Sequence, residues 1–177
     1  MEYLGYFIIK NKIPDAAGKV GQYFRFSEKV GVKIIGFYGC ESIKNLHKSP
    51  NWVKAQQESN WLNLVNSVSL APRSHGVFPV KFKGRFFAGV FMDHINGDSL
   101  NLQVDGLDFK QGCKVYVNKK GSISESGTPI RQYLKKKLDK VKVTHWDIHG
   151  ENVLIDKATK KVWLIDFSPA YIRKKKG

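Results

Sequence analysis

The segment 145–167 constrains the fold most, because it places three oxygen-bearing side chains around what its pattern predicts to be a β-hairpin. Asp147 and Asn152 precede the apolar run 153–155, and a second apolar run, after a polar turn, ends just before Asp166. Short β-branched runs separated by a turn indicate two antiparallel strands. Such a hairpin would hold the three side chains on rigid backbone and aim them into one cleft.

These three side chains form the set that phosphoryl transfer needs. One carboxylate accepts or orients the proton of the attacking hydroxyl, while an amide oxygen and a second carboxylate hold Mg²⁺ on the nucleotide phosphates. On this interpretation Asp147 is the catalytic base, and Asn152 and Asp166 are ligands of Mg²⁺ or Mn²⁺. The alternative interpretation is an ordinary β-hairpin whose turn carboxylates are solvated.

The rest of the chain predicts a mixed α+β protein. A helix is indicated over 52–65, where Ser49 can serve as N-cap and Pro50 as the first helical residue. Thr128 and Pro129 predict the start of a second helix. Runs rich in β-branched and aromatic residues predict strands at 3–10, 21–27, 30–38, 76–82, 85–94, 153–155 and 161–165, and we expect a short hairpin within 114–123.

In its order of motifs the chain resembles the protein-kinase-like superfamily. The segment 145–167 matches the catalytic loop H-x-D-x-x-x-x-N and the D-F metal-binding element of that family. Upstream, Val30-Gly31-Val32-Lys33 resembles the V-A-I-K strand, whose lysine contacts the α- and β-phosphates of ATP. The resemblance implies that Lys33 has this role and that Glu58, in the middle of the predicted helix, pairs with it.

Two further stretches resemble the nucleotide-binding elements of the family. Residues 16–23 fit the glycine-rich loop with alanine in place of the first glycine, which implies that the backbone at Gly18 and Gly21 approaches the phosphates closely. Residues 92–97 resemble the hinge between the lobes. There the resemblance implies that Met92 is the gatekeeper and that the backbone of Asp93 and Ile95 contacts adenine.

From this resemblance we expect a two-lobed protein-kinase-like α+β fold. Residues 1–97 would form the nucleotide-binding N-lobe, with a five-stranded antiparallel sheet and one main helix. Residues 98–177 would form a strongly truncated C-lobe that carries the catalytic loop and the D-F element.

Three departures from the family pattern indicate what kind of kinase this is. Trp146 stands where the family has the arginine that receives an activation-loop phosphate, so we expect no switching of that form. Ser168 replaces the glycine of the D-F element, and from the few residues that follow it here we expect neither an activation segment nor a peptide-docking platform. His149 takes the place of the usual lysine, as in small-molecule phosphotransferases of the aminoglycoside type.

The short distal segment is most similar to the minimal kinases that bacterial pathogens secrete as type III effectors (the OspG/NleH type). This resemblance implies a Ser/Thr protein kinase that acts on a host protein, and an activating partner that completes the truncated lobe. Two alternatives stay open: a small-molecule phosphotransferase of the aminoglycoside-kinase type, and a catalytically weak kinase-like module that binds partners through its basic surface.

Charge and composition restrict the partners and the compartment. A net charge of +15 favours an anionic partner, although charge alone identifies none, and for a kinase we do not expect nucleic acid. Cys40 and Cys113 are the two cysteines, which excludes a disulfide scaffold. The first residues lack a signal-peptide pattern, and no apolar run approaches the about 20 residues that cross a bilayer. We therefore expect a soluble protein, secreted into a host cell or else kept in the bacterial cytoplasm.

Overall fold

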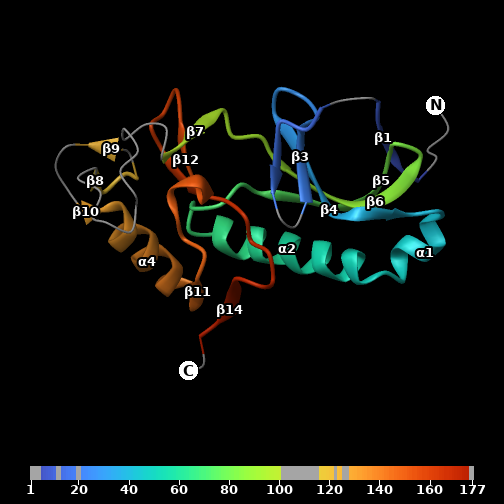
Figure 1. Cartoon of the computed structure of the whole chain (residues 1–177). Coiled ribbons are helices and arrows are strands. Elements are labelled where there is room, and N and C mark those ends of the chain that lie inside the picture. Colours follow the sequence, from blue (N-terminus) through green and yellow to red (C-terminus); the bar gives the residue numbers. More distant parts are fainter. Residues whose placement is uncertain are drawn as a thin grey trace. The chain divides into compact units, whose positions relative to one another are not determined.

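The computed structural model describes residues 5–10, 13–18, 21–100, 116–121, 123–124 and 128–175. The chain has an α+β architecture and divides into two compact units (Figure 1). The first unit contains Met1–Trp61 and Arg73–His94, and the second contains Leu62–Pro72 and Ile95–Gly177. The chain thus passes into the second unit at Ile95, and the second unit also takes a short segment from the N-terminal part of the sequence.

A six-stranded sheet dominates the first unit, with the strand order β1-β5-β6-β4-β3-β2. Its strands are β1 (Phe7–Ile9), β2 (Ala16–Gly18), β3 (Gly21–Arg25), β4 (Val30–Cys40), β5 (Ser74–Phe82) and β6 (Arg85–Asp93). Neighbouring strands are antiparallel except β1 and β5, which run parallel with Phe7 opposite Val80.

The expectation of five antiparallel strands was therefore wrong in two respects. The additional strand, β2, is an Ala-Ala-Gly run of low β-propensity, and it becomes a strand by pairing with β3. The direction of β1 is set by its pairing with β5, which is distant in sequence, and no local pattern encodes that choice.

Alternation along β4 sorts its side chains between the two faces of the sheet. Val32 and Ile34 are fully buried in an apolar cluster on one face, where aromatic residues of β3, β5 and β6 meet them. Lys33, between them in sequence, points to the opposite face. The members of the buried cluster are Ile9, Phe24, Val32, Ile34, Val80, Phe82, Phe87 and Phe91.

Two helices follow β4 and lie on the same side of the sheet (Figure 1). The short α1 (Ile43–His47) begins where the Ser42 hydroxyl accepts a hydrogen bond from the Asn45 N–H. The expected helix is α2 (Pro50–Asn66), and the Ser49 hydroxyl accepts from the Trp52 N–H as an N-cap does. Buried positions recur along α2 at helical spacing, and they are Ala55, Glu58, Ser59, Leu62 and Val65.

Among its described residues, the second unit contains the end of α2, one further helix and three small sheets. In α4 (Ile130–Lys140), which follows the proline expected to open it, Ile130, Tyr133, Leu134 and Leu138 are buried. The strands are β7 (Gly97–Ser99), β8 (Tyr116–Val117), β9 (Ile123–Ser124), β10 (Thr128–Pro129), β11 (Val143–His145), β12 (Val153–Asp156), β13 (Val162–Leu164) and β14 (Ile172–Lys174), with a 3₁₀ turn, η2, at Gly150–Asn152.

Two strand pairs in this unit frame the predicted catalytic segment. The expected hairpin forms between β12 and β13, with Val153 opposite Leu164. β11 leads into the predicted catalytic loop and pairs with β14, with His145 opposite Ile172. The hairpin expected within 114–123 appears as β8 and β9, while Lys114 and Cys113 lie outside the described residues.

Among the helices of the described residues, none has the length and apolar character that crossing a membrane requires.

Candidate active site

In the first unit, Lys33 on β4 and Glu58 on α2 form an ion pair. Lys33 Nζ lies 2.7 Å from Glu58 Oε1, and the side chains are 14% and 3% exposed. Lys33 projects from the face of β4 opposite the apolar cluster, and Glu58 belongs to the buried stripe of α2. The pair that the resemblance implied is therefore present, and its partly buried position strengthens the attraction between the two charges.

In the second unit, Asn152 holds Asp147 through two hydrogen bonds. Asn152 Nδ2 donates to the Asp147 carbonyl oxygen at 2.9 Å and to Asp147 Oδ2 at 3.2 Å. The η2 turn brings the two residues together, because the Asn152 N–H donates to the His149 carbonyl. Asn152 is buried, so its orientation is fixed by these bonds.

The β12–β13 hairpin brings Asp166 next to Asn152 along the backbone. The Ile165 N–H donates to the Asn152 carbonyl at 2.9 Å, directly beyond the last paired residues of the hairpin. Asp166 itself has φ 61°, a left-handed conformation that costs energy for most residues and that Asp tolerates better. A residue keeps such a costly conformation only where the surrounding structure imposes it, so the neighbours of Asp166 determine where its carboxylate points.

His145 links Asp147 to Asp166, a role that the sequence reasoning missed. Its Nε2 donates to the Asp166 carbonyl at 2.9 Å, and its Nδ1 accepts from the Asp147 N–H at 3.2 Å. Because a carbonyl can only accept and an N–H can only donate, the ring is the neutral Nε2–H tautomer. Burial lowers the pKa of His145, the Asp166 carbonyl opposes this less strongly, and Phe167 packs edge-on against the ring at 5.4 Å between centroids. In the sequence, the one indication of this role was that His145 is the first residue of the H-x-D-x-x-x-x-N motif.

His149 contacts the carboxylate of Asp147. His149 Nε2 lies 3.6 Å from Asp147 Oδ2, and both side chains are about one-third exposed, at 32% and 34%. At this distance a protonated ring would form an ion pair with the carboxylate, and a neutral ring would not. His149 can therefore act on Asp147 directly, whichever role it has toward a phosphate.

The donor set of this loop is suited to a hard divalent cation that also binds phosphate. Since Nδ2 of Asn152 is committed to Asp147, its amide oxygen is the atom it can offer to a metal, beside the carboxylate of Asp166. Mg²⁺ prefers such oxygens and takes its remaining ligands from water and substrate phosphates. Within the described part of the chain, no group of three or more His, Cys, Asp and Glu side chains could form a complete metal site alone.

The two glycines expected to cradle phosphate lie at the ends of the β2–β3 connection. Gly18 ends β2, Gly21 begins β3 and the two are Cα partners, while residues 19–20 lie outside the described residues. A Cβ added at position 21 would lie 2.2 Å from the Ile34 carbonyl oxygen on β4. Strand packing alone thus requires glycine at position 21.

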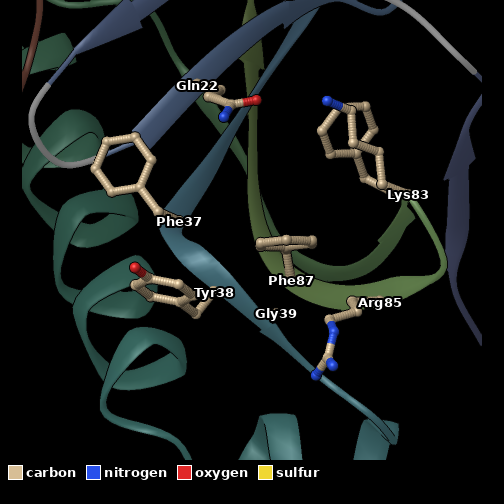
Figure 2. A pocket seen from close by; sticks show the side chains of 8 residues that line it. Gln22, Phe37, Tyr38, Gly39, Lys83, Arg85 and Phe87 are labelled. Carbon is tan, nitrogen blue, oxygen red and sulfur yellow. The ribbon is translucent and has the colours of Figure 1, made fainter.

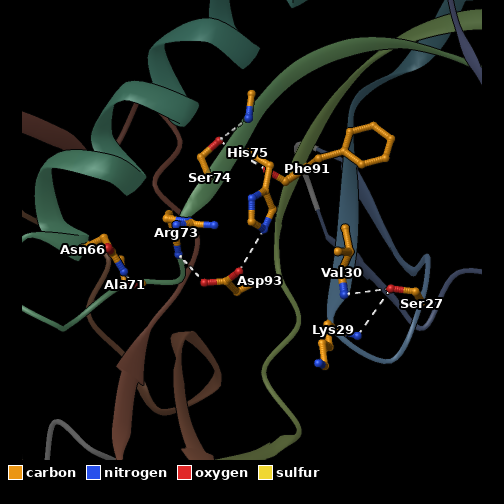
Figure 3. Close-up of polar contacts among 11 residues, drawn as sticks. Ser27, Lys29, Val30, Asn66, Ala71, Arg73, Ser74, His75, Phe91 and Asp93 are labelled. Atoms are coloured by element: carbon orange, nitrogen blue, oxygen red, sulfur yellow. Dashed lines mark hydrogen bonds and ion pairs between the residues drawn. The ribbon is translucent and has the colours of Figure 1, made fainter.

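Around the predicted hinge, Asp93 ties the end of β6 to the start of β5 (Figure 3). The Asp93 N–H donates to the Arg73 carbonyl, and the carboxylate accepts from the Arg73 N–H and contacts His75 Nε2 at 2.8 Å. The backbone N–H of Asp93, one of the groups expected to contact adenine, is therefore already used within the protein. Met92 is buried, and the carbonyl of Ile95, in the second unit, accepts from the Gly97 N–H.

A pocket of about 420 Å³ opens on the sheet of the first unit, and Gln22, next to Gly21 on β3, is one of its lining residues (Figure 2). None of the residues expected to bind nucleotide lines it. The lining residues are Gln22, Phe37, Tyr38, Gly39, Phe82, Lys83, Arg85 and Phe87.

The predicted catalytic and metal-binding residues thus form two groups, each within one unit, and neither group includes the predicted glycine-loop or hinge residues. Lys33 and Glu58 are paired in the first, whereas the second contains the catalytic-loop group, made up of Asp147, His149, Asn152 and Asp166 and linked through His145. Neither a protein-family model nor a curated protein matches the chain.

Proposed function

We propose that the chain is an ATP- and Mg²⁺-dependent phosphotransferase, a minimal Ser/Thr protein kinase of the bacterial effector type that acts on a host protein. One observation carries the proposal: Asp147, Asn152 and Asp166 are joined by hydrogen bonds around one hairpin and one buried histidine. Ordinary hairpins with solvated turn carboxylates need no such network.

In the proposed reaction each residue has a role that follows from its chemistry. Asp147 accepts the proton of the attacking serine or threonine hydroxyl, and Asn152 fixes the direction of its carboxylate. Lys33, oriented by Glu58, binds the α- and β-phosphates. The amide oxygen of Asn152 and the carboxylate of Asp166 would hold Mg²⁺ (or Mn²⁺), which neutralises phosphate charge when bound.

Incubation with γ-³²P-labelled ATP tests this function directly. The acceptors are the protein alone, a generic protein substrate, a host-cell lysate and an aminoglycoside. We expect Mg²⁺-dependent label in protein, and more of it with the lysate if the lysate supplies an activating host partner. Label in the aminoglycoside alone would support the small-molecule alternative instead. ATP binding, measured as a shift in Tm, without transfer to any acceptor would support the binding module.

Variants of the predicted catalytic loop and the D-F element test whether the activity depends on the residues proposed for it. Asp166→Ala should lower transfer about 100-fold or more, because phosphate charge is no longer compensated. The matched control is Glu151→Gln, which neutralises an exposed carboxylate of the same loop and should retain activity. Equal activities of Asp166→Ala and the wild-type protein would refute the assignment.

A further inference from the structure

The pocket on the first unit has an aromatic side and a cationic side. Figure 2 shows Phe37 and Tyr38 along one side, Lys83 and Arg85 along the other, and Phe87 between them. Its volume of about 420 Å³ falls within the range of pockets that bind small molecules. One lining residue, Gln22, belongs to the segment 16–23 that resembles the glycine-rich loop, and the other lining residues lie outside the proposed phosphotransferase site.

A bulge in β4 creates the aromatic side. β4 pairs with β6 as far as Ile35, loses register, and resumes at Cys40 opposite Phe86. Gly36 has φ 84°, a backbone conformation that turns the strand where side-chain residues would be strained. As a result Phe37 and Tyr38 both line the pocket, although successive residues of a regular strand point to opposite faces.

These two aromatic side chains are unusually exposed. Phe37 is 52% exposed and Tyr38 is 89% exposed. Aromatic residues and arginine are enriched at protein interfaces, where they act as anchors around which a partner packs. Gly39 keeps the strand close to the floor of the pocket, because a Cβ there would lie 2.8 Å from the ring of Phe87.

The cationic side is fixed by a tight turn. Lys83 and Gly84 join β5 to β6 with φ of 48° and 80°, as a two-residue hairpin turn requires, and Arg85 follows opposite Phe82. Lys83 Nζ lies 5.3 Å from the centroid of the Phe82 ring. Arg85 Nη1 lies 3.8 Å from Glu41 Oε1, but both side chains are mostly exposed. This ion pair is therefore weak, and a carboxylate of a partner can replace Glu41.

We propose that this pocket binds an acidic segment of a partner protein through one large aromatic or apolar side chain. The anchor side chain inserts between Tyr38 and Phe87, and the flanking carboxylates of the segment pair with Lys83 and Arg85. Two cations on one side match a pair of carboxylates, whereas nucleic acid binding draws on a longer row of phosphate contacts. This inference does not depend on the proposed kinase activity.

The test measures fluorescence anisotropy of labelled short peptides with the full chain. The first peptide has one tryptophan flanked by glutamates, the second has serine in place of tryptophan, and the third has lysines in place of the glutamates. We expect binding of the first peptide only, weakening as salt rises. An oligothymidine of similar length serves as the nucleic acid probe.

Paired variants separate the pocket from general surface effects. Tyr38→Ser should weaken binding about tenfold, while Val53→Ser, an equally polar change at an exposed apolar residue of α2, should not. The double variant Lys83→Glu/Arg85→Glu should lose the glutamate peptide and gain the lysine peptide. Lys29→Glu/Lys54→Glu changes the net charge equally at exposed residues outside the pocket lining and should retain the wild-type preference.

Three results would overturn the proposal. These are the absence of binding to the glutamate–tryptophan peptide, equal binding by the pocket variants and their controls, and tighter binding of oligothymidine that depends on Lys83 and Arg85. Because the changed side chains are exposed or at the rim, unaltered Tm values will show that the variants remain folded.

Discussion

At the scale of single residues, His145 joins two backbone groups that belong to different parts of the candidate site. Replacement by leucine leaves the Asp166 carbonyl and the Asp147 N–H without this partner. An unsatisfied buried polar group costs about 1–3 kcal/mol, so the free energy of unfolding should fall by about that amount. Urea unfolding at pH 7.5 measures the change, and a difference below about 0.5 kcal/mol would contradict the linking role.

The same residue predicts a pH dependence of stability. The pKa of His145 in the folded protein is lowered below its usual 6.5, so the unfolded chain binds the proton more readily. The contribution is fully present above pH 6.5 and is lost as pH falls through the folded pKa. The free energy of unfolding should therefore decrease from pH 7.5 to pH 5.5, and less so in His145→Leu. The pKa of His94 is lowered in the same direction, so comparison with His94→Leu separates the two contributions.

The Lys33–Glu58 pair allows a structural role to be distinguished from a catalytic one. Lys33→Met removes the cation that lies 2.7 Å from the carboxylate of Glu58, which is 3% exposed, and this should destabilise the protein by about 3–5 kcal/mol. Adding Glu58→Gln removes the buried charge and should restore much of that stability. Phosphate transfer should stay lost in both variants, because the phosphate contact of Lys33 is absent from each. Recovery of transfer in the double variant would show that Lys33 is only structural.

At the scale of elements, local sequence signals predicted those helices and strands whose start and pairing are both encoded within one short segment. Ser49 as N-cap, Pro50 as first helical residue and the buried stripe predicted the start of α2 to within two residues, and the β12–β13 hairpin followed from two apolar runs and a turn. The sequence predicted a strand around β1 but not its parallel direction, and it did not predict β7, β11 or β14. These short strands form by pairing with partners that are distant in sequence. The contacts of His145 depend on the same β11–β14 and hairpin pairings, which explains why its role was missed.

The β11–β14 pair makes a prediction about the segment after Asp166. Ile172 is buried at 3% and stands opposite His145, whereas Lys174, two residues on in the same strand, is exposed. Ile172→Ser should lower the free energy of unfolding by about 2–5 kcal/mol, as loss of a buried aliphatic side chain does. Lys174→Ser should leave it unchanged within about 0.5 kcal/mol. Similar Tm values for the two variants would mean that β14 does not support the strand that leads into the catalytic loop.

At the scale of the whole molecule, a net charge of +15 opposes compaction of the chain. The exposed face of α4 contributes Lys135, Lys136 and Lys140, and Lys175 forms an ion pair with Asp139 beside them. Salt shortens the range of repulsion between exposed charges to about 10 Å at 0.1 M and about 3 Å at 1 M. Screening also weakens exposed ion pairs, but the excess of positive charge makes repulsion the larger effect.

Raising NaCl from 50 to 500 mM should therefore raise Tm by about 2–4 °C, which corresponds to about 1 kcal/mol for a chain of this size. The variant Lys135→Gln/Lys136→Gln/Lys140→Gln has a higher Tm at low salt and a smaller rise. Salt is also excluded from the protein surface, which stabilises the wild-type protein and the triple variant almost equally. The difference between their rises in Tm therefore measures the charge repulsion alone. Thermal unfolding followed by circular dichroism measures both. Identical salt responses would mean that the lysines of α4 repel no neighbouring charge strongly enough to affect folding, and that the excess charge acts elsewhere on the molecule.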